Sequence, residues 1–156
     1  GDFMFGLDLP IPLKGMKQLR RALRLMLPFV SHFPMSLLFY GSSGTEYKPK
    51  YTRYWQAADL IAGDFLFMKK YMPADLTGKT IVTNTTTADN VETLRARGVK
   101  RLITTTPRYE GRSFGTNMME AALTVYAGKG RTLNHAELNA LIDELGLRPT
   151  VETLNP

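Results

Sequence analysis

Short apolar runs alternate with amphipathic stretches over the second half of the chain. Three runs are rich in strand-favouring residues, and each breaks off in Gly, Asp, Asn, Thr or Pro: ADLIAGDF, KTIVTNTTT and KRLITTTP. Their starting points, Asp59, Thr80 and Arg101, are separated by 21 residues each time. This distance is too long for hairpins and is typical of parallel strands joined by crossovers.

One helical pattern lies between the second and third apolar runs, and two more follow the third run. The stretch ADNVETLRARG can be capped by Thr87 and can end at Gly98. MMEAALTVYAG predicts a helix that ends at Gly128, and LNHAELNALIDELG predicts one that begins at Asn134, with Glu137 three residues later. The order of elements predicts an α/β fold, a Rossmann-like three-layer sandwich with a mostly parallel sheet.

A different pattern occupies the N-terminal third. The stretch KGMKQLRRALRLMLPFV repeats apolar residues at helical spacing with cations largely between them, which predicts a basic amphipathic helix over residues 14–27. Pro28 cannot continue the helical hydrogen bonds, so we expect an end or a kink near Leu27. Farther on, a GSSG sequence and Pro49 predict an exposed loop or arm with five aromatic residues: Tyr40, Tyr47, Tyr51, Tyr54 and Trp55.

We interpret the 156 residues as a single α/β domain. Residues 1–56 form a basic helical arm with an aromatic loop, 57–128 the strand-helix-strand core, and 129–156 a C-terminal helix and tail. The apolar run over 25–40 contains prolines and a histidine and is too short for a membrane span, so we expect no transmembrane segment and a cytoplasmic protein. Because the chain begins at Gly1 without Met, we expect a processed protein or a piece of a longer one.

The charge is concentrated in the same N-terminal third. The chain has a formal net charge of +6, and residues 1–56 hold eight cations against three carboxylates. The other residues hold twelve cations and eleven carboxylates, so the candidate ligand-binding half is nearly neutral and we expect no nucleic-acid partner. The basic helix could pack on the core or on a partner, join two copies into a homo-oligomer, or contact an anionic membrane surface or a nucleic acid.

Composition removes several kinds of chemistry. The absence of Cys excludes disulfides, thiolate zinc sites, iron–sulfur clusters and Cys nucleophiles. The two histidines, His32 and His135, lie far apart and are interpreted as packing or capping residues, so no metal site is expected. Neither G-x-G-x-x-G nor the Walker pattern occurs.

Polar residues follow each predicted strand, at the edge where open parallel sheets bind ligands. Their hydroxyl and amide groups could hydrogen-bond a ribose, a phosphate or a polyol. The candidates for contact with a small-molecule ligand are Asp64, Asn84, Thr85, Thr86, Thr87, Thr105, Thr106 and Arg108. The alternative is structural, because Thr suits strands and Thr, Asn and Asp cap helices. Lys69 and Lys70 could donate a proton, although the exposed face of a short helix is the interpretation we favour.

The loop RYEGRSFGTN offers a second candidate site. Its glycines permit close backbone approach, its arginines can hold anions, and the following helix start presents free amides. The candidates for a phosphate or carboxylate clamp are Arg108, Gly111, Arg112, Ser113, Gly115 and Asn117. The alternative is a surface loop that is capped by Ser113 or Thr116.

Five stretches together resemble the bacterial quinate 5-dehydrogenase (quinate/shikimate dehydrogenase-like) family: GDFMFGLDLPIPL, ADLIAGDFLFMKKYMP, GKTIVTNTTT, LITTTPRYEGRSFGTN and LGLRP. The most specific parts are NTTT and TTTP-R-x-x-G-R-S-F-G-T-N. The resemblance covers nearly the whole chain and implies the C-terminal portion of a dehydrogenase that oxidises a cyclic polyol acid, such as quinate or shikimate, with NAD or NADP.

The same resemblance implies roles for particular residues. It would place Asp2 at the adenosine ribose and residues 84–87 beside the nicotinamide half of the cofactor. Together with the sheet-edge candidates, the cofactor residues would be Asp2, Asp64, Asn84, Thr85, Thr86, Thr105 and Thr106. Without the first strand and its glycine turn, we expect weak dinucleotide binding and no catalysis by this chain alone. The alternative function is a non-enzymatic module that binds a phosphorylated or carboxylated metabolite through residues 108–117.

Overall fold

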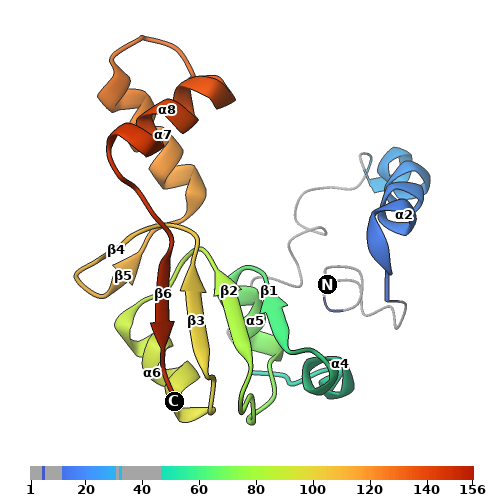
Figure 1. The fold of residues 1–156 in the computed structure, drawn as a ribbon. Coiled ribbons are helices and arrows are strands. Elements are labelled where there is room, and N and C mark those ends of the chain that lie inside the picture. The colour runs from blue at the N-terminus through green and yellow to red at the C-terminus, as the bar shows by residue number, and fades with distance from the viewer. Residues whose placement is uncertain (1–4, 6–11, 31, 33–46) are drawn as a thin grey trace. The chain divides into compact units, whose positions relative to one another are not determined.

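The computed structural model describes Phe5, residues 12–30, His32 and residues 47–156 (Figure 1). Contacts divide the chain into two compact units, an N-terminal unit, Gly1–Lys50, and an α/β unit, Tyr51–Pro156. The candidate cofactor residue Asp2 and the aromatic residue Tyr40 lie outside the described residues. No helix in the described part of the chain has the length and apolar character needed to cross a bilayer.

Helix α2, Gly15–Val30, confirms the amphipathic helix predicted for the N-terminal third. The expected end near Leu27 is wrong, because the helix continues through Pro28 to Val30. The other form of that expectation, a kink near Leu27, stays a prediction. Pro28 lies in the last turn, so the one hydrogen bond that its missing N–H removes affects only the end of the helix. His32 follows at once, with Nδ1 2.7 Å from the Pro28 carbonyl oxygen.

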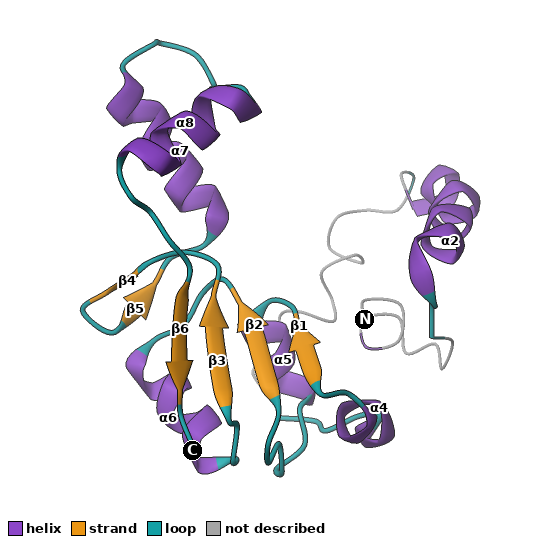
Figure 2. Ribbon diagram, in the orientation of Figure 1, coloured by secondary structure: helices purple, strands orange, loops and turns teal. Residues whose placement is uncertain are grey.

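The α/β unit contains a four-stranded sheet with the order β1-β2-β3-β6 (Figure 2). Its strands are β1, Leu60–Ala62, β2, Thr80–Thr83, β3, Arg101–Thr104, and β6, Thr150–Thr153. The first three are parallel and in register from Leu60 to Thr80 to Arg101, which confirms the parallel strands predicted from their spacing. The pattern did not predict β6, which pairs antiparallel with β3 at the edge.

Three helices in this unit begin at residues that the sequence offered as caps, whereas the helix after the 108–117 loop has Gly115 as its N-cap and is not capped by Ser113 or Thr116 as the alternative interpretation of that loop expected. Asp64 caps α5, Phe65–Tyr71, and Thr87 caps α6, Ala88–Ala96, by accepting from the Asn90 amide. Helix α7, Thr116–Ala127, ends at Gly128, and α8, His135–Glu144, begins with a capping box of Asn134 and Glu137. These boundaries confirm the three helices predicted from Thr87 onward.

One aromatic segment departs from its expected form. The prediction of an exposed loop is wrong for the last residues of this segment, because they form helix α4, Thr52–Ala57, in which Trp55 is buried. Tyr51, with a φ of 53°, occupies the N-cap of this helix. Burial of the indole against the α/β unit outweighs the turn-forming tendency of the preceding Pro and Gly residues.

Helices α5 and α6 lie over one face of the sheet (Figure 1). The core is apolar and consists of side chains that are at most 4% exposed: Phe65, Met68, Ile81, Leu94, Val99 and Leu102. On the opposite face, the register joins Ala62, Val82, Ile103 and Val151 in one row across all four strands. Val151 in this row is 62% exposed. The described unit is therefore a mixed α/β fold with a mostly parallel sheet.

At the start of α8, Glu137 is surrounded by donors. Its carboxylate accepts from Lys129 Nζ at 2.7 Å, from Arg131 at 2.7 and 2.9 Å, and from the Asn134 amide at 3.0 Å. These hydrogen bonds, those from Arg131 foremost, hold the pKa of Glu137 well below its ordinary value. The charged carboxylate therefore stabilises the fold above the unfolded-state pKa of about 4.3, and this contribution fades as the pH falls toward the folded-state pKa.

We expect Glu137→Gln to lower the melting temperature by a few degrees at neutral pH, because the ion cluster and the capping box both lose their charge. The difference from the wild type should narrow as the pH falls below about 4. Circular dichroism melts between neutral and acidic pH measure both effects. Asp143→Asn, which removes the exposed pair with Arg148 on the same helix, is the control and should change little. If the difference in melting temperature between Glu137→Gln and the wild type stayed constant with pH, the lowered pKa of Glu137 would not be the source of the stabilisation.

Candidate functional site

The carboxyl ends of β1, β2 and β3 meet at one edge of the sheet (Figure 2). Beyond β3 the chain forms a hairpin of β4, Arg108–Tyr109, and β5, Arg112–Ser113, where the sequence predicted a loop. Glu110 and Gly111 both have positive φ, 49° and 79°, as a two-residue hairpin turn of type I′ requires. The Glu-Gly pair between two short polar runs was the available signal, and it is weaker than Asn-Gly or Asp-Gly.

Two of the predicted ligand residues instead fasten this hairpin. The Ser113 amide donates to the Thr86 carbonyl at 3.0 Å, and the Thr86 amide donates to Ser113 Oγ at 2.8 Å. Their hydroxyl oxygens lie 2.9 Å apart, and both residues are buried. Thr86 and Ser113 therefore hold the hairpin to the segment between β2 and α6.

Other predicted ligand residues also have structural partners. Asp64 Oδ1 accepts from the Leu66 and Phe67 amides, as an N-cap does. The buried Thr106 hydroxyl lies 2.6 Å from the Phe114 carbonyl oxygen and 3.1 Å from that of Asn84. Thr105 is exposed, and its amide donates to the Thr83 carbonyl.

The two arginines of the predicted clamp are not brought together. The hairpin register pairs Arg108 with Ser113 and Tyr109 with Arg112, so the two arginines lie on opposite faces of the ribbon. Arg108 forms an ion pair with Glu152 and donates to the Gly111 carbonyl at 3.2 Å. Arg112 is exposed on the other face. The prediction that Arg108 and Arg112 bind one anion together does not fit this geometry.

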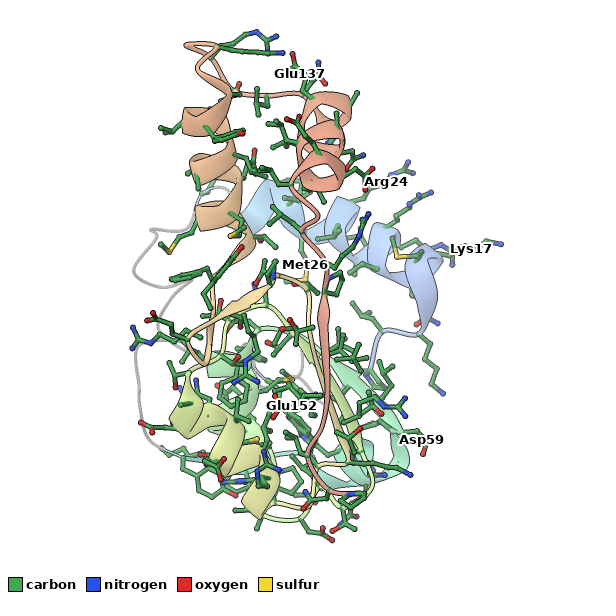
Figure 3. All side chains as sticks on the ribbon, turned by 60° about the vertical axis from the view of Figure 1, so that its left-hand side comes forward. Lys17, Arg24, Met26, Asp59, Glu137 and Glu152 are labelled. Atoms are coloured by element: carbon green, nitrogen blue, oxygen red, sulfur yellow. The ribbon has the colours of Figure 1, made fainter. Side chains whose placement is uncertain are left out.

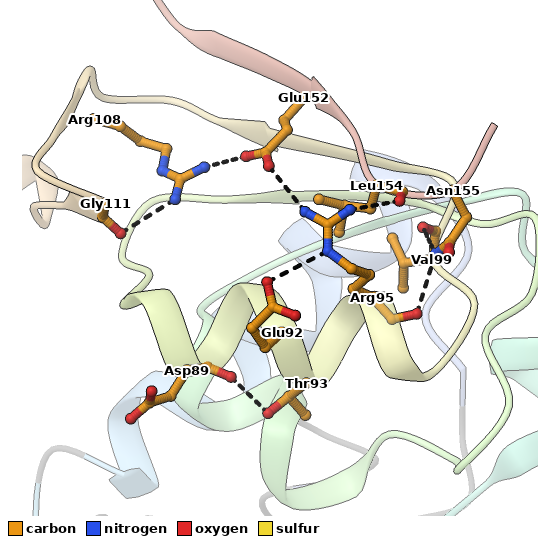
Figure 4. A network of polar contacts seen from close by, with 10 residues as sticks. All are labelled: Asp89, Glu92, Thr93, Arg95, Val99, Arg108, Gly111, Glu152, Leu154 and Asn155. Carbon is orange, nitrogen blue, oxygen red and sulfur yellow. Dashed lines mark hydrogen bonds and ion pairs between the residues drawn. The ribbon is translucent and has the colours of Figure 1, made fainter.

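Glu152 joins three parts of the α/β unit (Figure 4). Its carboxylate pairs with Arg108 of the hairpin and, at 3.4 Å, with Arg95 of α6. Arg95 also donates to the Leu154 carbonyl at 2.7 Å, and the Asn155 amide group donates to the Arg95 and Val99 carbonyls. This network fastens the C-terminal strand to α6 and to the hairpin.

Buried polar atoms that lack a hydrogen-bond partner occur at the carboxyl edge of the sheet and in the hairpin. In the described part of the chain, the buried side-chain atoms without a hydrogen-bond partner are Thr83 Oγ1, Asn84 Oδ1, Thr104 Oγ1 and Arg108 Nε. Thr83 and Thr104 are register partners at the ends of β2 and β3, and they are 2% and 1% exposed. Because buried polar atoms are normally hydrogen-bonded, these are atoms to which a ligand or an ordered water could supply partners.

Helix α7 begins close to the segment that follows β2. A Cβ placed on its N-cap, Gly115, would lie 3.4 Å from Thr85 Oγ1, so the helix start approaches the end of β2 closely. No side chain caps α7 and its first turn holds no acidic residue, which leaves the Thr116 and Asn117 amides without intrahelical acceptors. We call this set, Asn84, Thr85 and Gly115–Asn117, the edge site.

The edge site offers hydrogen bonds and no fixed charge of its own. Backbone amides and the Asn117 side chain can donate, whereas the Thr85 hydroxyl and the Asn84 amide group can donate or accept. The positive end of the helix dipole favours a ligand with an anionic or electron-rich group. Among the described residues, no group of three His, Asp or Glu side chains could hold a metal ion.

Acid-base candidates lie elsewhere. His135 begins α8 and is exposed, and His32 belongs to the N-terminal unit. Lys69 and Lys70 lie on α5, with Lys69 Nζ 3.5 Å from Asn90 Oδ1 and Lys70 Nζ 5.4 Å from the centre of the Tyr71 ring. The edge site is therefore suited to binding and orienting a ligand.

Comparison with known proteins gives a family for the chain. No curated protein and no solved structure matches it. One family model matches residues 1–154 and thus spans α2, the sheet, the hairpin and the edge site. The chain therefore belongs to the family described as Domain of unknown function (DUF8754).

Proposed function

We propose that the α/β unit is the ligand-binding part of a cytoplasmic NAD(P)-dependent dehydrogenase that acts on a cyclic polyol acid such as quinate or shikimate. The observation that carries this proposal is the set of unsatisfied buried polar atoms at the ends of β2 and β3, together with the uncapped start of α7, which lies close to the end of β2. Both features lie at the carboxyl edge of a parallel sheet, where α/β enzymes bind their ligands. The sequence resemblance to the quinate dehydrogenase-like family supplies the reaction and substrate class.

The chemistry of the edge site suits the nicotinamide half of a dinucleotide. The Asn84 amide group and the Thr85 hydroxyl can bind a carboxamide or ribose hydroxyls, and the Thr116 and Asn117 amides can bind a phosphate. A bound nicotinamide would supply the hydride acceptor. The protein residues would orient it and satisfy the buried oxygens, while the acid-base group would come from outside the edge site.

The face of the sheet opposite α5 and α6 supports the three-layer architecture that we propose with this function. Helices α5 and α6 cover one face, and the row of Ala62, Val82, Ile103 and Val151 forms an apolar strip on the other. Mostly parallel sheets are usually covered on both faces, because βαβ crossovers place helices there. The proposed three-layer fold therefore requires a second helical layer over this strip.

Titration of the protein with NAD and with NADP by calorimetry tests the proposal. We expect one of the two cofactors to bind, and Asn84→Ala and Thr85→Val each to weaken that binding about tenfold by removing one hydrogen bond. Asn84→Ala should leave the melting temperature unchanged or raise it, because it deletes a buried oxygen that has no partner. Weaker binding without loss of stability is the signature of a ligand residue.

Thr86→Val provides the matched control. It removes a hydroxyl that is bound within the protein, so stability should fall by about 1 kcal/mol. The dehydrogenase proposal would be overturned if neither NAD nor NADP produced a heat of binding. It would also be overturned if Asn84→Ala and Thr85→Val both bound the cofactor with unchanged affinity. Binding of inorganic phosphate or quinate in place of both cofactors would instead establish the alternative, a non-enzymatic metabolite-binding module.

A further inference from the structure

Helix α2 separates its apolar and basic residues onto two sides. Met16, Leu19, Leu23 and Met26 recur three or four residues apart and share one side with Ala22 and Leu27. Lys17, Arg20, Arg21 and Arg24 follow the same spacing on the other side. Figure 3 shows Met26 and Arg24 on different sides of the helix.

The charge of this helix has a single sign. No Asp or Glu occurs between Asp8 and Glu46, whereas five cations lie within Lys14–Arg24. No ion pair joins any of the five to a carboxylate within the described residues. The helix therefore presents a cationic face whose counter-charge must come from solvent ions or from a partner.

Large apolar side chains on the other face are open to solvent. Met16 is 62% exposed, Leu27 57% and Leu23 41%. Nucleic acid would neutralise the cations but would leave these side chains in water, because its affinity comes chiefly from phosphate contacts. An anionic lipid surface satisfies both faces, since the acyl region takes the Met and Leu side chains while the head groups meet the Lys and Arg side chains.

We propose that α2 is an interfacial helix that docks the protein on an anionic phospholipid surface. The apolar face enters the boundary between head groups and acyl chains, and the long basic side chains extend back to the phosphates. The helix lies in the plane of the membrane and does not cross it. This inference is independent of the proposed catalytic function, because it uses no residue of the edge site.

Flotation of the full chain with lipid vesicles tests the proposal. We expect the protein to float with vesicles that contain about one third phosphatidylglycerol in phosphatidylcholine, and to stay behind with pure phosphatidylcholine. Arg20→Gln with Arg24→Gln should weaken the binding about 10- to 30-fold. Lys100→Gln with Arg101→Gln removes the same charge from exposed positions of the α/β unit and should bind as the wild type does.

A second pair of variants tests the apolar face. Leu27→Gln should weaken vesicle binding about tenfold. Leu25→Gln should bind as the wild type does, because Leu25 follows Arg21 by four residues and lies toward the polar side although it is 71% exposed. Absence of flotation overturns the proposal, and so does equal binding by Leu25→Gln and Leu27→Gln. Salt-sensitive binding to duplex DNA that Leu27→Gln leaves intact, with no flotation, would assign the helix to nucleic acid instead.

Discussion

Gly98→Ala is expected to destabilise the α/β unit by about 3 kcal/mol, the largest effect of any single-methyl addition that the structure suggests. Gly98 connects α6 to β3 with a φ of 79°, a conformation that costs an L-residue roughly 1 to 2 kcal/mol. A Cβ there would also lie 2.5 Å from Thr77 Oγ1 and 3.0 Å from Thr77 Cα. Contact with a backbone atom cannot be relieved by rotating a side chain.

Thr77 has little freedom to move away from this contact. Its amide and hydroxyl both donate to Asp75 Oδ1, at 2.9 and 2.6 Å, and these bonds lower the pKa of Asp75. The neighbouring amide of Gly78 donates to the Gly98 carbonyl at 3.0 Å. The turn before β2 and the turn before β3 are thereby held against each other.

Gly78→Ala is the matched control for this prediction. Gly78 has a similar φ of 74°, but a Cβ there would meet nothing within 4 Å. The Gly78→Ala variant should therefore lose only the roughly 1 to 2 kcal/mol of stability that a positive φ costs an L-residue. Urea unfolding of the two variants measures the difference, which isolates the contact with Thr77. Equal losses would show that the turn adjusts to the extra methyl group without cost.

The elements that the sequence predicts well are those whose signals are local. Each parallel strand contains at least two adjacent apolar residues, at 60–62, 81–82 and 102–103, and the caps at Thr87 and Asn134 act within three residues of themselves. The missed strand β6 is short and polar, with Thr150, Glu152 and Thr153 among its four residues. Its pairing with β3 depends on a segment about fifty positions away, which no local pattern encodes.

The sequence located the candidate site, but it could not separate the residues available to a ligand from those bound within the protein. The rule for parallel sheets placed the Thr-rich segments at one edge, and the structure brings them there. Sequence alone could not distinguish Thr86, whose hydroxyl is bound to Ser113, from Thr85, which adjoins the uncapped helix. It also missed Glu152 as the partner of Arg108, because the two are separated by 44 positions.

Glu152→Ala is the second substitution with a large expected effect, a loss of about 2 kcal/mol of stability. The Arg108 side chain is only 18% exposed and its Nε already lacks a partner, so losing the carboxylate would leave a mostly buried cation unpaired. The more exposed pair with Arg95 contributes less, because solvent screens it. The hairpin that Glu152 holds also carries Ser113, so the edge site should loosen as stability falls.

A double-mutant cycle separates the ion pair from the general effect of truncation. Arg108→Leu alone should also destabilise the protein, but Glu152→Ala with Arg108→Leu should recover about 1 kcal/mol or more relative to the sum of the single losses, because no unpaired buried charge remains. Glu92→Ala removes a carboxylate that is 70% exposed and forms, within the described residues, an ion pair with Arg95, so it should cost no more than about 0.5 kcal/mol. Strict additivity in the cycle, measured by urea unfolding, would mean that Glu152 and Arg108 act independently and that other contacts, such as the Thr86–Ser113 hydrogen bonds, hold the hairpin.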